Sequence, residues 1–273
     1  MNLIDFDGHF SQYLDTWTVQ NAHRFKRPED MEEEMPSVYL KFLNTPAPWL
    51  DGATPGSYFD RYADAGELTK LMVDYVNQED CSVPDPLLER LVELGDENPL
   101  LSLMRDTSAP CEARMLAIDL LRQMESDSPM VDYLRWQVER REEDELLDAA
   151  LESLEEMGEA ALGPAKVAFL AAGEEGKEAL LDVLANGPRD EDVFAFALNA
   201  FQHHKEKRAL YAGYLAKLDD DRALEALLEV AEGDDVSYID FIEIRSAIER
   251  LGGEAPVRDF SNDPTYHAVK RLQ

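Results

Sequence analysis

The strongest constraint on the fold is a two-helix pattern that returns along the chain at a nearly fixed internal offset. Residues 178–201 show it best, as a short apolar helical pattern, a Gly-Pro break and a second apolar helical pattern. In this copy Leu181 lies sixteen residues before the phrase that begins at Ala197. The other copies join Leu101 to Ala117, Leu134 to Ala150, and, with an offset of nineteen, Leu228 to Ala247. Helical units that recur in this way predict an all-α repeat protein.

Proline and glycine residues divide the repeat region further. In three copies an additional helical pattern, closed by a glycine or an acidic turn, precedes the two-helix phrase. These leading patterns cover residues 87–94, 164–172 and 210–217. The copy at 129–157 lacks one, so the steps between copies vary. We therefore predict about four repeats of two or three helices over residues 81–253, followed by a cap or tail at 254–273.

The alternation of two- and three-helix units over residues 84–253 resembles the HEAT and armadillo families. The resemblance implies a right-handed α-solenoid, in which each repeat packs only on its neighbours. HEAT-type repeats often carry an Arg or Lys at a set interior position. Arg114 and Arg245 stand near the start of second helices, whereas Leu147 and Phe194 occupy the equivalent places in the other two copies.

Residues 1–80 do not follow the repeat and form a helical N-terminal region. Aromatic and aliphatic side chains lie on one stripe at helical spacing over residues 5–20, which predicts an amphipathic helix. Further on, Pro46 and Pro48 favour an extended path, and Thr54 with Pro55 is typical of a helix start. We therefore expect a helix to end near Asn44, a rigid turn at 43–56 to carry Trp49, and a new helix to begin at Pro55.

This turn is similar to a phrase in the toxin-binding domain of Xre/MbcA/ParS-type antitoxins. The matching residues are Leu43, Pro46, Leu50, Gly52, Thr54 and Pro55. Phe42 stands where the family usually has Trp, and Ala47 where Asn is common. The resemblance implies a toxin-binding surface at residues 43–59. The alternative is a structural helix-turn-helix that buries Trp49.

The charge balance restricts the partners. With 26 Lys and Arg against 58 Asp and Glu, the net charge is −32, so most of the surface repels polyanions. Nucleic acid and anionic membranes are therefore poor partners, and a basic protein segment is a good one. The chain also lacks an apolar run of the roughly 18 residues needed to span a bilayer.

The first ten residues carry acids where an export signal would carry Lys or Arg, and Cys81 and Cys111 show no disulfide or zinc spacing. We expect a monomer in the reducing cytoplasm.

Motifs for catalysis or cofactors are absent from the sequence. The five histidines form no metal-ligand pattern, and no phosphate-binding glycine motif or nucleophile elbow occurs. The pair His203-His204 is expected at a helix end, where cations suit the helix dipole. Acidic groups at 142–145, 155–156 and 219–221 suit solvated helix starts and turns. We therefore expect no catalytic residues, no cofactor and no metal.

These features together predict a non-catalytic scaffold whose acidic concave surface binds a basic protein partner. The candidate interaction residues are Trp49, Asp51, Trp136, His203 and His204. Two alternatives stay open: a regulatory, antitoxin-like protein that binds through residues 43–59, and an enzyme on a HEAT-type scaffold with an acidic metal site.

Overall fold

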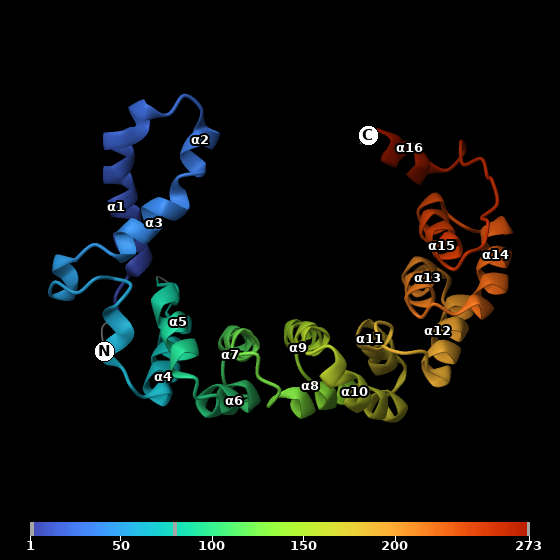
Figure 1. The fold of residues 1–273 in the computed structure, drawn as a ribbon, viewed down its shortest axis with the longest axis horizontal. Helices are drawn as coiled ribbons and strands as arrows, with labels where there is room; N and C mark the ends of the chain where they lie inside the picture. The colour runs from blue at the N-terminus through green and yellow to red at the C-terminus, as the bar shows by residue number, and fades with distance from the viewer. Residues whose placement is uncertain (1–2, 79–80, 272–273) are drawn as a thin grey trace. The chain divides into compact units, whose positions relative to one another are not determined.

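The backbone is all-helical in the computed structural model, which describes residues 3–78 and 81–271, and these residues contain no β-strand (Figure 1). The all-α prediction is thus confirmed. In order, the first helices are α1 (Phe6–Asn21), α2 (Pro28–Glu32), α3 (Met35–Leu43), α4 (Ala65–Val76), α5 (Asp85–Leu94), α6 (Asn98–Arg105), α7 (Cys111–Gln123) and α8 (Met130–Glu139). They are followed by α9 (Asp144–Glu156), α10 (Glu159–Ala171), α11 (Glu174–Leu184), α12 (Glu191–His203), α13 (Arg208–Lys217), α14 (Leu224–Glu232), α15 (Tyr238–Arg250) and α16 (Pro264–Lys270). Within the described residues, no helix combines the length and the apolar character needed to cross a membrane.

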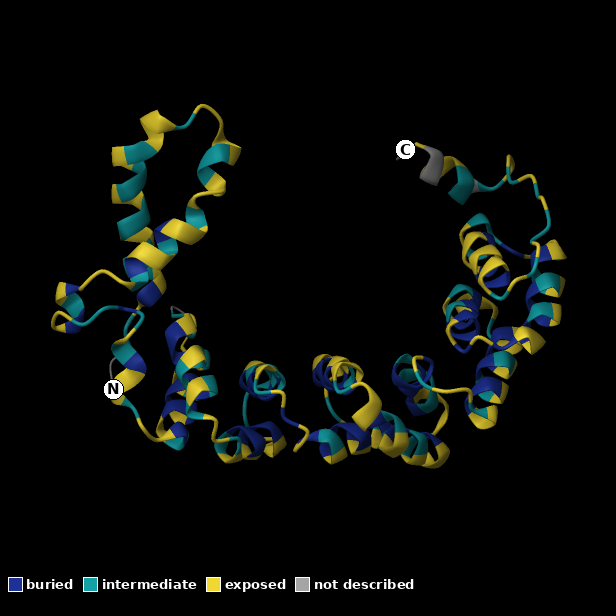
Figure 2. Cartoon of the chain, in the orientation of Figure 1, coloured by how far each residue is buried: buried dark blue, intermediate teal, exposed yellow. Residues whose placement is uncertain are grey.

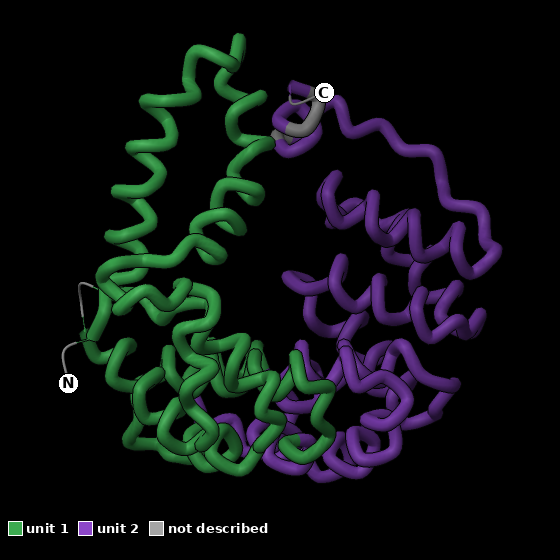
Figure 3. Tube along the Cα trace, turned by 60° about the vertical axis from the view of Figure 1, so that its left-hand side comes forward, with its two compact units in different colours: residues 1–129, 143–149 green, residues 130–142, 150–273 purple. Residues whose placement is uncertain are grey.

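The chain divides into two compact units (Figure 3). The first contains residues 1–129 and 143–149, and the second contains residues 130–142 and 150–273, so that the division passes through α9. This division lies later in the chain than the boundary at residue 80 that we expect from the sequence. Each unit has its own buried core, described separately below.

The core of the first unit is built by α4 to α7. The most extensive contact joins α6 to α7, and α4 packs on α5, α6 and α7. Leu68, Leu87, Leu100 and Ile118, one from each helix, are fully buried. In the hairpin of α1 and α3, most residues are half-buried or exposed instead (Figure 2). The amphipathic helix expected over 5–20 is present as α1, but only its Phe6 is fully inside.

The segment between α3 and α4 begins where the sequence predicts, but the helix that follows it begins later than expected. The helix does end near Asn44, which caps α3, but no helix begins at Pro55. A turn and a short 3₁₀ segment (Tyr58–Arg61) follow, and α4 begins only at Ala65. The reason is that Asp64 is the effective cap, since its carboxylate accepts hydrogen bonds from the backbone N–H groups of Gly66 at 2.7 Å and Glu67 at 3.1 Å.

In the second unit, α14 packs on α15, as the phrase from Leu228 to Ala247 predicts, but α11 and α12 differ from the expectation. The main contacts of α11 are with α10 and then α8, and α12 packs chiefly on α13. In Figure 1, α10, α12 and α14 accordingly lie on one side of this unit and α11, α13 and α15 on the other. The prediction is therefore wrong for α11, whose main partner is α10 and not α12. Only Ala172 and Gly173 connect α10 to α11, and so short a connection favours antiparallel neighbours.

Pro164 explains part of this error. Its position suggests a helix start, but α10 begins at Glu159 after Gly158, whose φ of 56° suits glycine. Pro164 therefore lies inside the helix, where it removes one backbone hydrogen bond to Ala160. Because Ala160 is exposed, water can satisfy the carbonyl group that is left without a backbone donor. A helix that begins five residues earlier than expected then forms the pair with α11.

Polar side chains link successive pairs in the second unit at a spacing near thirty residues. The Tyr214 hydroxyl donates to the Asp182 carboxylate at 2.6 Å, and Tyr211 donates to Glu178. Burial, followed by the hydrogen bond to Asp182, raises the pKa of Tyr214, so this phenol stays protonated as a donor. Similar links join Lys207 to Glu178, Arg222 to Glu191 and Arg189 to Asp219. The two candidate interior arginines differ: Arg114 is buried, with its Nε 2.9 Å from the Met104 carbonyl, whereas Arg245 is exposed and pairs with Glu249.

The segment after α15 packs back on the second unit. The Asp263 carboxylate accepts a hydrogen bond from the Tyr238 backbone N–H at 2.8 Å, and the Phe260 ring lies 4.9 Å from that of Phe241. Arg258 donates to the Ala231 carbonyl at 2.9 Å. These contacts cover the outer side of α15 and the end of α14.

Two glycines of the second unit give a matched test of this packing. A Cβ atom on Gly176 would lie 2.5 Å from the carbonyl oxygen of Gln137 in α8, whereas one on Gly213 in α13 would meet nothing within 4 Å. We expect Gly176→Ala to lower the free energy of unfolding by about 1–3 kcal/mol through overpacking. Gly213→Ala should raise it by about 0.5–1 kcal/mol through restriction of the unfolded chain. Urea unfolding followed by circular dichroism measures both, and the reverse ranking would contradict the close approach of α8 and α11.

Candidate functional site

The first two turns of α9 carry a dense group of acidic side chains in the first unit. Glu143, Asp144, Glu145 and Asp148, called the α9 acidic cluster below, are all exposed. The sequence explains where they stand, because residues 142–159 contain nine acids and no Lys, Arg or His. Leu146 and Leu147 are buried on the other side of the helix. The positive end of the helix dipole stabilises acids in the first turn, but their mutual repulsion favours a cationic partner.

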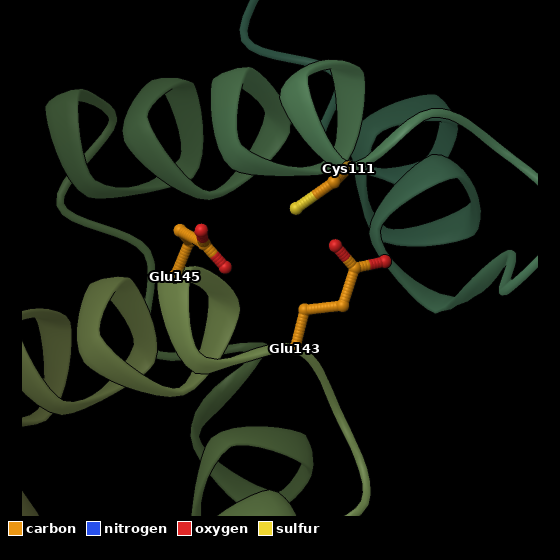
Figure 4. Close-up of side chains that lie close together, drawn as sticks. All are labelled: Cys111, Glu143 and Glu145. Carbon is orange, nitrogen blue, oxygen red and sulfur yellow. The ribbon is translucent and has the colours of Figure 1, made fainter.

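Cys111 lies against this cluster. It is the first residue of α7, and Figure 4 shows its thiol and the side chains of Glu143 and Glu145 pointing toward one another. One ligand atom from each of the three lies within 4.8 Å of the others. Burial, followed by the hydrogen bond to Glu143 and the charges of Glu143 and Glu145, raises the pKa of Cys111 to about 11. The thiol is therefore protonated at neutral pH and donates to a carboxylate.

These three groups have the chemistry of a small open cation site. A thiolate and two carboxylates suit Zn²⁺, and three protein ligands leave a fourth position for water or substrate. The donor atoms would have to draw closer, because zinc bonds of about 2.0–2.3 Å cannot hold donors as far apart as the 4.8 Å limit of this group. A bound cation would also lower the pKa of Cys111, because its positive charge stabilises the thiolate that the two carboxylates destabilise.

Of the two residues expected in a binding turn, Trp49 packs against the start of α1 and Asp51 does not. The Trp49 ring stacks on His9 with ring centroids 3.9 Å apart and meets Phe6 edge-on at 5.4 Å. Trp49 is thus half-buried and anchors the turn. Asp51 follows it in a left-handed conformation with φ of 56° and is exposed. Of these two, only Asp51 presents its side chain freely to solvent.

The remaining candidates lie in the second unit. Trp136 is 3% exposed and lies in the core at α8, so it offers no surface for a partner. His203 ends α12, as expected, and is exposed, with its Nδ1 2.8 Å from the Asn199 carbonyl. His204 Nε2 lies 2.8 Å from the Glu174 carboxylate at the start of α11.

A cavity of about 520 Å³ adjoins His204. Its lining includes Arg140, Glu174, Glu178 and Lys207. Two polar pairs lie in this lining, since His204 faces Glu174 and Lys207 pairs with Glu178 at 2.6 Å. Burial raises the pKa of Glu178, but the hydrogen bonds from Lys207 and Tyr211 outweigh burial and leave it lowered. This arrangement ties α11 to the segment before α13 and explains these residues structurally.

The contact of Cys111 with Glu143 and Glu145 is not predicted from the sequence when cysteines are considered only as disulfide pairs or zinc-binding clusters. The signal was present in the repeat: α7 begins at residue 111 and α9 at residue 144, a separation of 33 residues. The apolar phrases at Ala117 and Ala150 are separated by the same step. Equivalent helix starts in adjacent repeats lie near each other, so this period alone predicts that Cys111 meets the acids of residues 143–145.

Comparison with known proteins found no matching family model and no matching curated protein.

The raised pKa of Cys111 predicts slow alkylation. In a Cys81→Ser background, Glu143→Gln removes one charge and one hydrogen-bond acceptor, so the thiolate fraction should rise. We expect the rate of reaction with iodoacetamide at pH 8 to increase about threefold or more. The matched control is Glu112→Gln, the next residue on α7, which should change the rate less than about twofold. Equal effects of the two substitutions would contradict a specific contact between Cys111 and Glu143.

Proposed function

We propose that the protein is a non-catalytic interaction scaffold that binds a basic segment of a partner protein through its acidic surface. The proposed architecture is a right-handed α-solenoid of HEAT- or armadillo-like repeats, acting as a monomer in the cytoplasm. The observation that carries the functional proposal is the exposed α9 acidic cluster in a chain whose net charge is −32.

The helix order supports a repeat architecture. From α6 onward, the first helix of each pair begins at residues 98, 130, 159, 191 and 224. Successive starts are therefore 29 to 33 residues apart, which is a more regular step than the apolar phrases indicate. Polar links at nearly the same spacing, such as Tyr214 to Asp182, accompany it in the second unit. Stacked helix pairs of this length are typical of solenoid repeats.

The local charge supports the partner's chemistry. Acids at positions one, two and five of α9 repel one another by roughly 0.2–0.5 kcal/mol per pair at helical spacing. A lysine- or arginine-rich segment relieves this repulsion and gains long-range attraction from the whole chain, which speeds association. Both effects weaken as salt screens the charges.

A labelled peptide of about fifteen residues with evenly spaced lysines tests this function by fluorescence anisotropy. The triple variant Asp144→Asn, Glu145→Gln, Asp148→Asn removes three charges but keeps Glu143 at the helix start. Exposed ion pairs contribute about 0.2–1 kcal/mol each, so we expect the loss of three to weaken binding roughly threefold to 150-fold. Raising NaCl from 50 to 500 mM should weaken binding of the unmodified protein as well.

The matched control is Glu225→Gln, Glu229→Gln, Glu232→Gln, which removes three exposed charges from α14. Both triple variants have a net charge three units less negative than −32. If the α14 variant weakens binding as much as the α9 variant, net charge alone attracts the peptide and the α9 acidic cluster is not a binding surface. Binding that is insensitive to salt would contradict the proposal altogether.

A metal-dependent activity is a second candidate, favoured by the convergence of Cys111, Glu143 and Glu145 (Figure 4). Titration with Co²⁺ tests it, because a cobalt–thiolate bond gives a charge-transfer absorption in the near ultraviolet. We expect this absorption to saturate at one equivalent and to vanish in Cys111→Ser, while Cys81→Ser retains it. Absence of the band in the unmodified protein would remove this candidate.

The antitoxin-like alternative at residues 43–59 stays a prediction. Trp49 is engaged with His9 and Phe6, which accounts for the turn by packing within the first unit. None of the described contacts favours a toxin-binding role over this structural one.

A further inference from the structure

A small cavity in the first unit has walls of a distinctive chemistry. Its volume is about 130 Å³, and it lies where the starts of α1 and α5 meet α3. One side is aromatic, and the other is formed by residues 82–86, which include two prolines. Two carboxylates, Asp7 and Asp85, complete the lining. The aromatic side consists of Phe6, Phe10, Tyr39 and Phe42.

The aromatic rings form one connected group. The Phe10 ring meets that of Tyr39 at 5.0 Å between centroids and 78° between planes, and that of Phe42 at 5.2 Å and 55°. Tyr39 and Phe42 are closer to parallel, at 24° between planes, so the Phe10 ring is inclined to both of them. A cation near such a group is attracted by the ring quadrupoles within about 6 Å of a ring centroid.

Acidic groups reinforce this negative potential. The Tyr39 hydroxyl donates a hydrogen bond to Asp85 Oδ2 at 2.9 Å. Burial, followed by this bond and by the charges of Asp85, Asp7 and Glu89, raises the pKa of Tyr39. Two of these carboxylates, Asp7 and Asp85, line the cavity itself, and both favour a positive occupant.

We infer that this cavity binds the ammonium group of a lysine side chain presented by a basic partner. The inference rests on the proposed function and gives it an anchoring point in the first unit. A volume of 130 Å³ equals that of about four water molecules, which suits a slender alkylammonium chain. The aromatic wall would take the methylene chain and one face of the ammonium group, while Asp7 and Asp85 would accept its hydrogen bonds.

Lysine is preferred over arginine because of shape. A guanidinium group is a wide planar fork that matches carboxylates bidentately, whereas an ammonium group is compact and donates in three directions. The cavity is small, at about 130 Å³, and its two carboxylates share the lining with aromatic rings. A compact head group therefore makes better use of the space.

The experiment uses n-butylammonium chloride as the lysine mimic, n-butanol as its neutral counterpart and n-butylguanidinium as the arginine mimic. Aromatic NMR signals of Phe10 and Tyr39 are followed in the whole protein at constant ionic strength. We expect saturable shifts with butylammonium and at least fivefold weaker binding of the other two. Equal binding of butanol would overturn the cationic site, and equal or tighter binding of butylguanidinium would overturn the assignment to lysine.

The variant Asp7→Asn, Asp85→Asn removes both carboxylates and leaves the aromatic wall intact. It should weaken butylammonium binding about tenfold, while Asp15→Asn, an exposed acid further along α1, should leave it unchanged. Equal loss in the control would show that diffuse charge, and not the cavity, attracts the cation. The result is independent of peptide binding at α9, since butylammonium can occupy the cavity whether or not a lysine-rich peptide binds the α9 acidic cluster.

Discussion

Apolar contact between neighbouring short helices is the interaction on which the rest of this chain depends. The described α-helices have 5 to 16 residues, and isolated helices shorter than about 12–15 residues are marginal in water. Each must therefore bury one face against a neighbour. In the second unit α13 does so on two sides, against α12 and α15, with Tyr211 and Leu215 fully buried. The two-helix step near thirty residues follows from this requirement, because each helix pair has an apolar face that the next pair along the chain can cover.

The sequence predicts the helices far better than it predicts their partners. Apolar periodicity correctly indicates α1 over residues 5–20, and Pro46 with Pro48 correctly indicates the end of α3 near Asn44, because both depend on local features of the chain. The sequence pairs α11 with α12 instead of α10, since Pro164 resembles a helix start and an offset of sixteen does not say which helices pack together. The helix start predicted at Pro55 is wrong for a related reason. Thr-Pro is typical of a helix start, but Asp64 supplies the N-cap of α4. Proline restricts the backbone, and tertiary packing determines whether a helix begins there.

For the candidate sites as well, the sequence predicts local structure but not contacts between residues far apart in the chain. Trp49 was correctly placed in a turn, yet its stacking on His9 depends on a contact across forty residues. Trp136 was chosen as an interaction residue, but helical spacing alone cannot separate a buried aromatic residue from an exposed one, and it is buried. The meeting of Cys111 with Glu143 and Glu145 follows from the repeat period and not from any motif. Sites that arise between equivalent positions of adjacent repeats need a correct period before they become visible.

The distribution of cations explains why the acidic surplus remains available to a partner. Many of the 26 Lys and Arg residues act inside the fold: Lys166 pairs with Asp190 and Asp192, Arg208 is buried beside Asp235, and Arg222 joins Glu191 to Asp220. Exchanging these pairs for pairs with an outside anion would leave the buried Asp220 and the half-buried Asp190 without a counter-charge. The cations are therefore structural, whereas acids such as those of the α9 acidic cluster remain exposed. A chain built in this way could receive positive charge from a partner without giving up any of its internal links, and this is the electrostatic basis for the basic ligand that we propose.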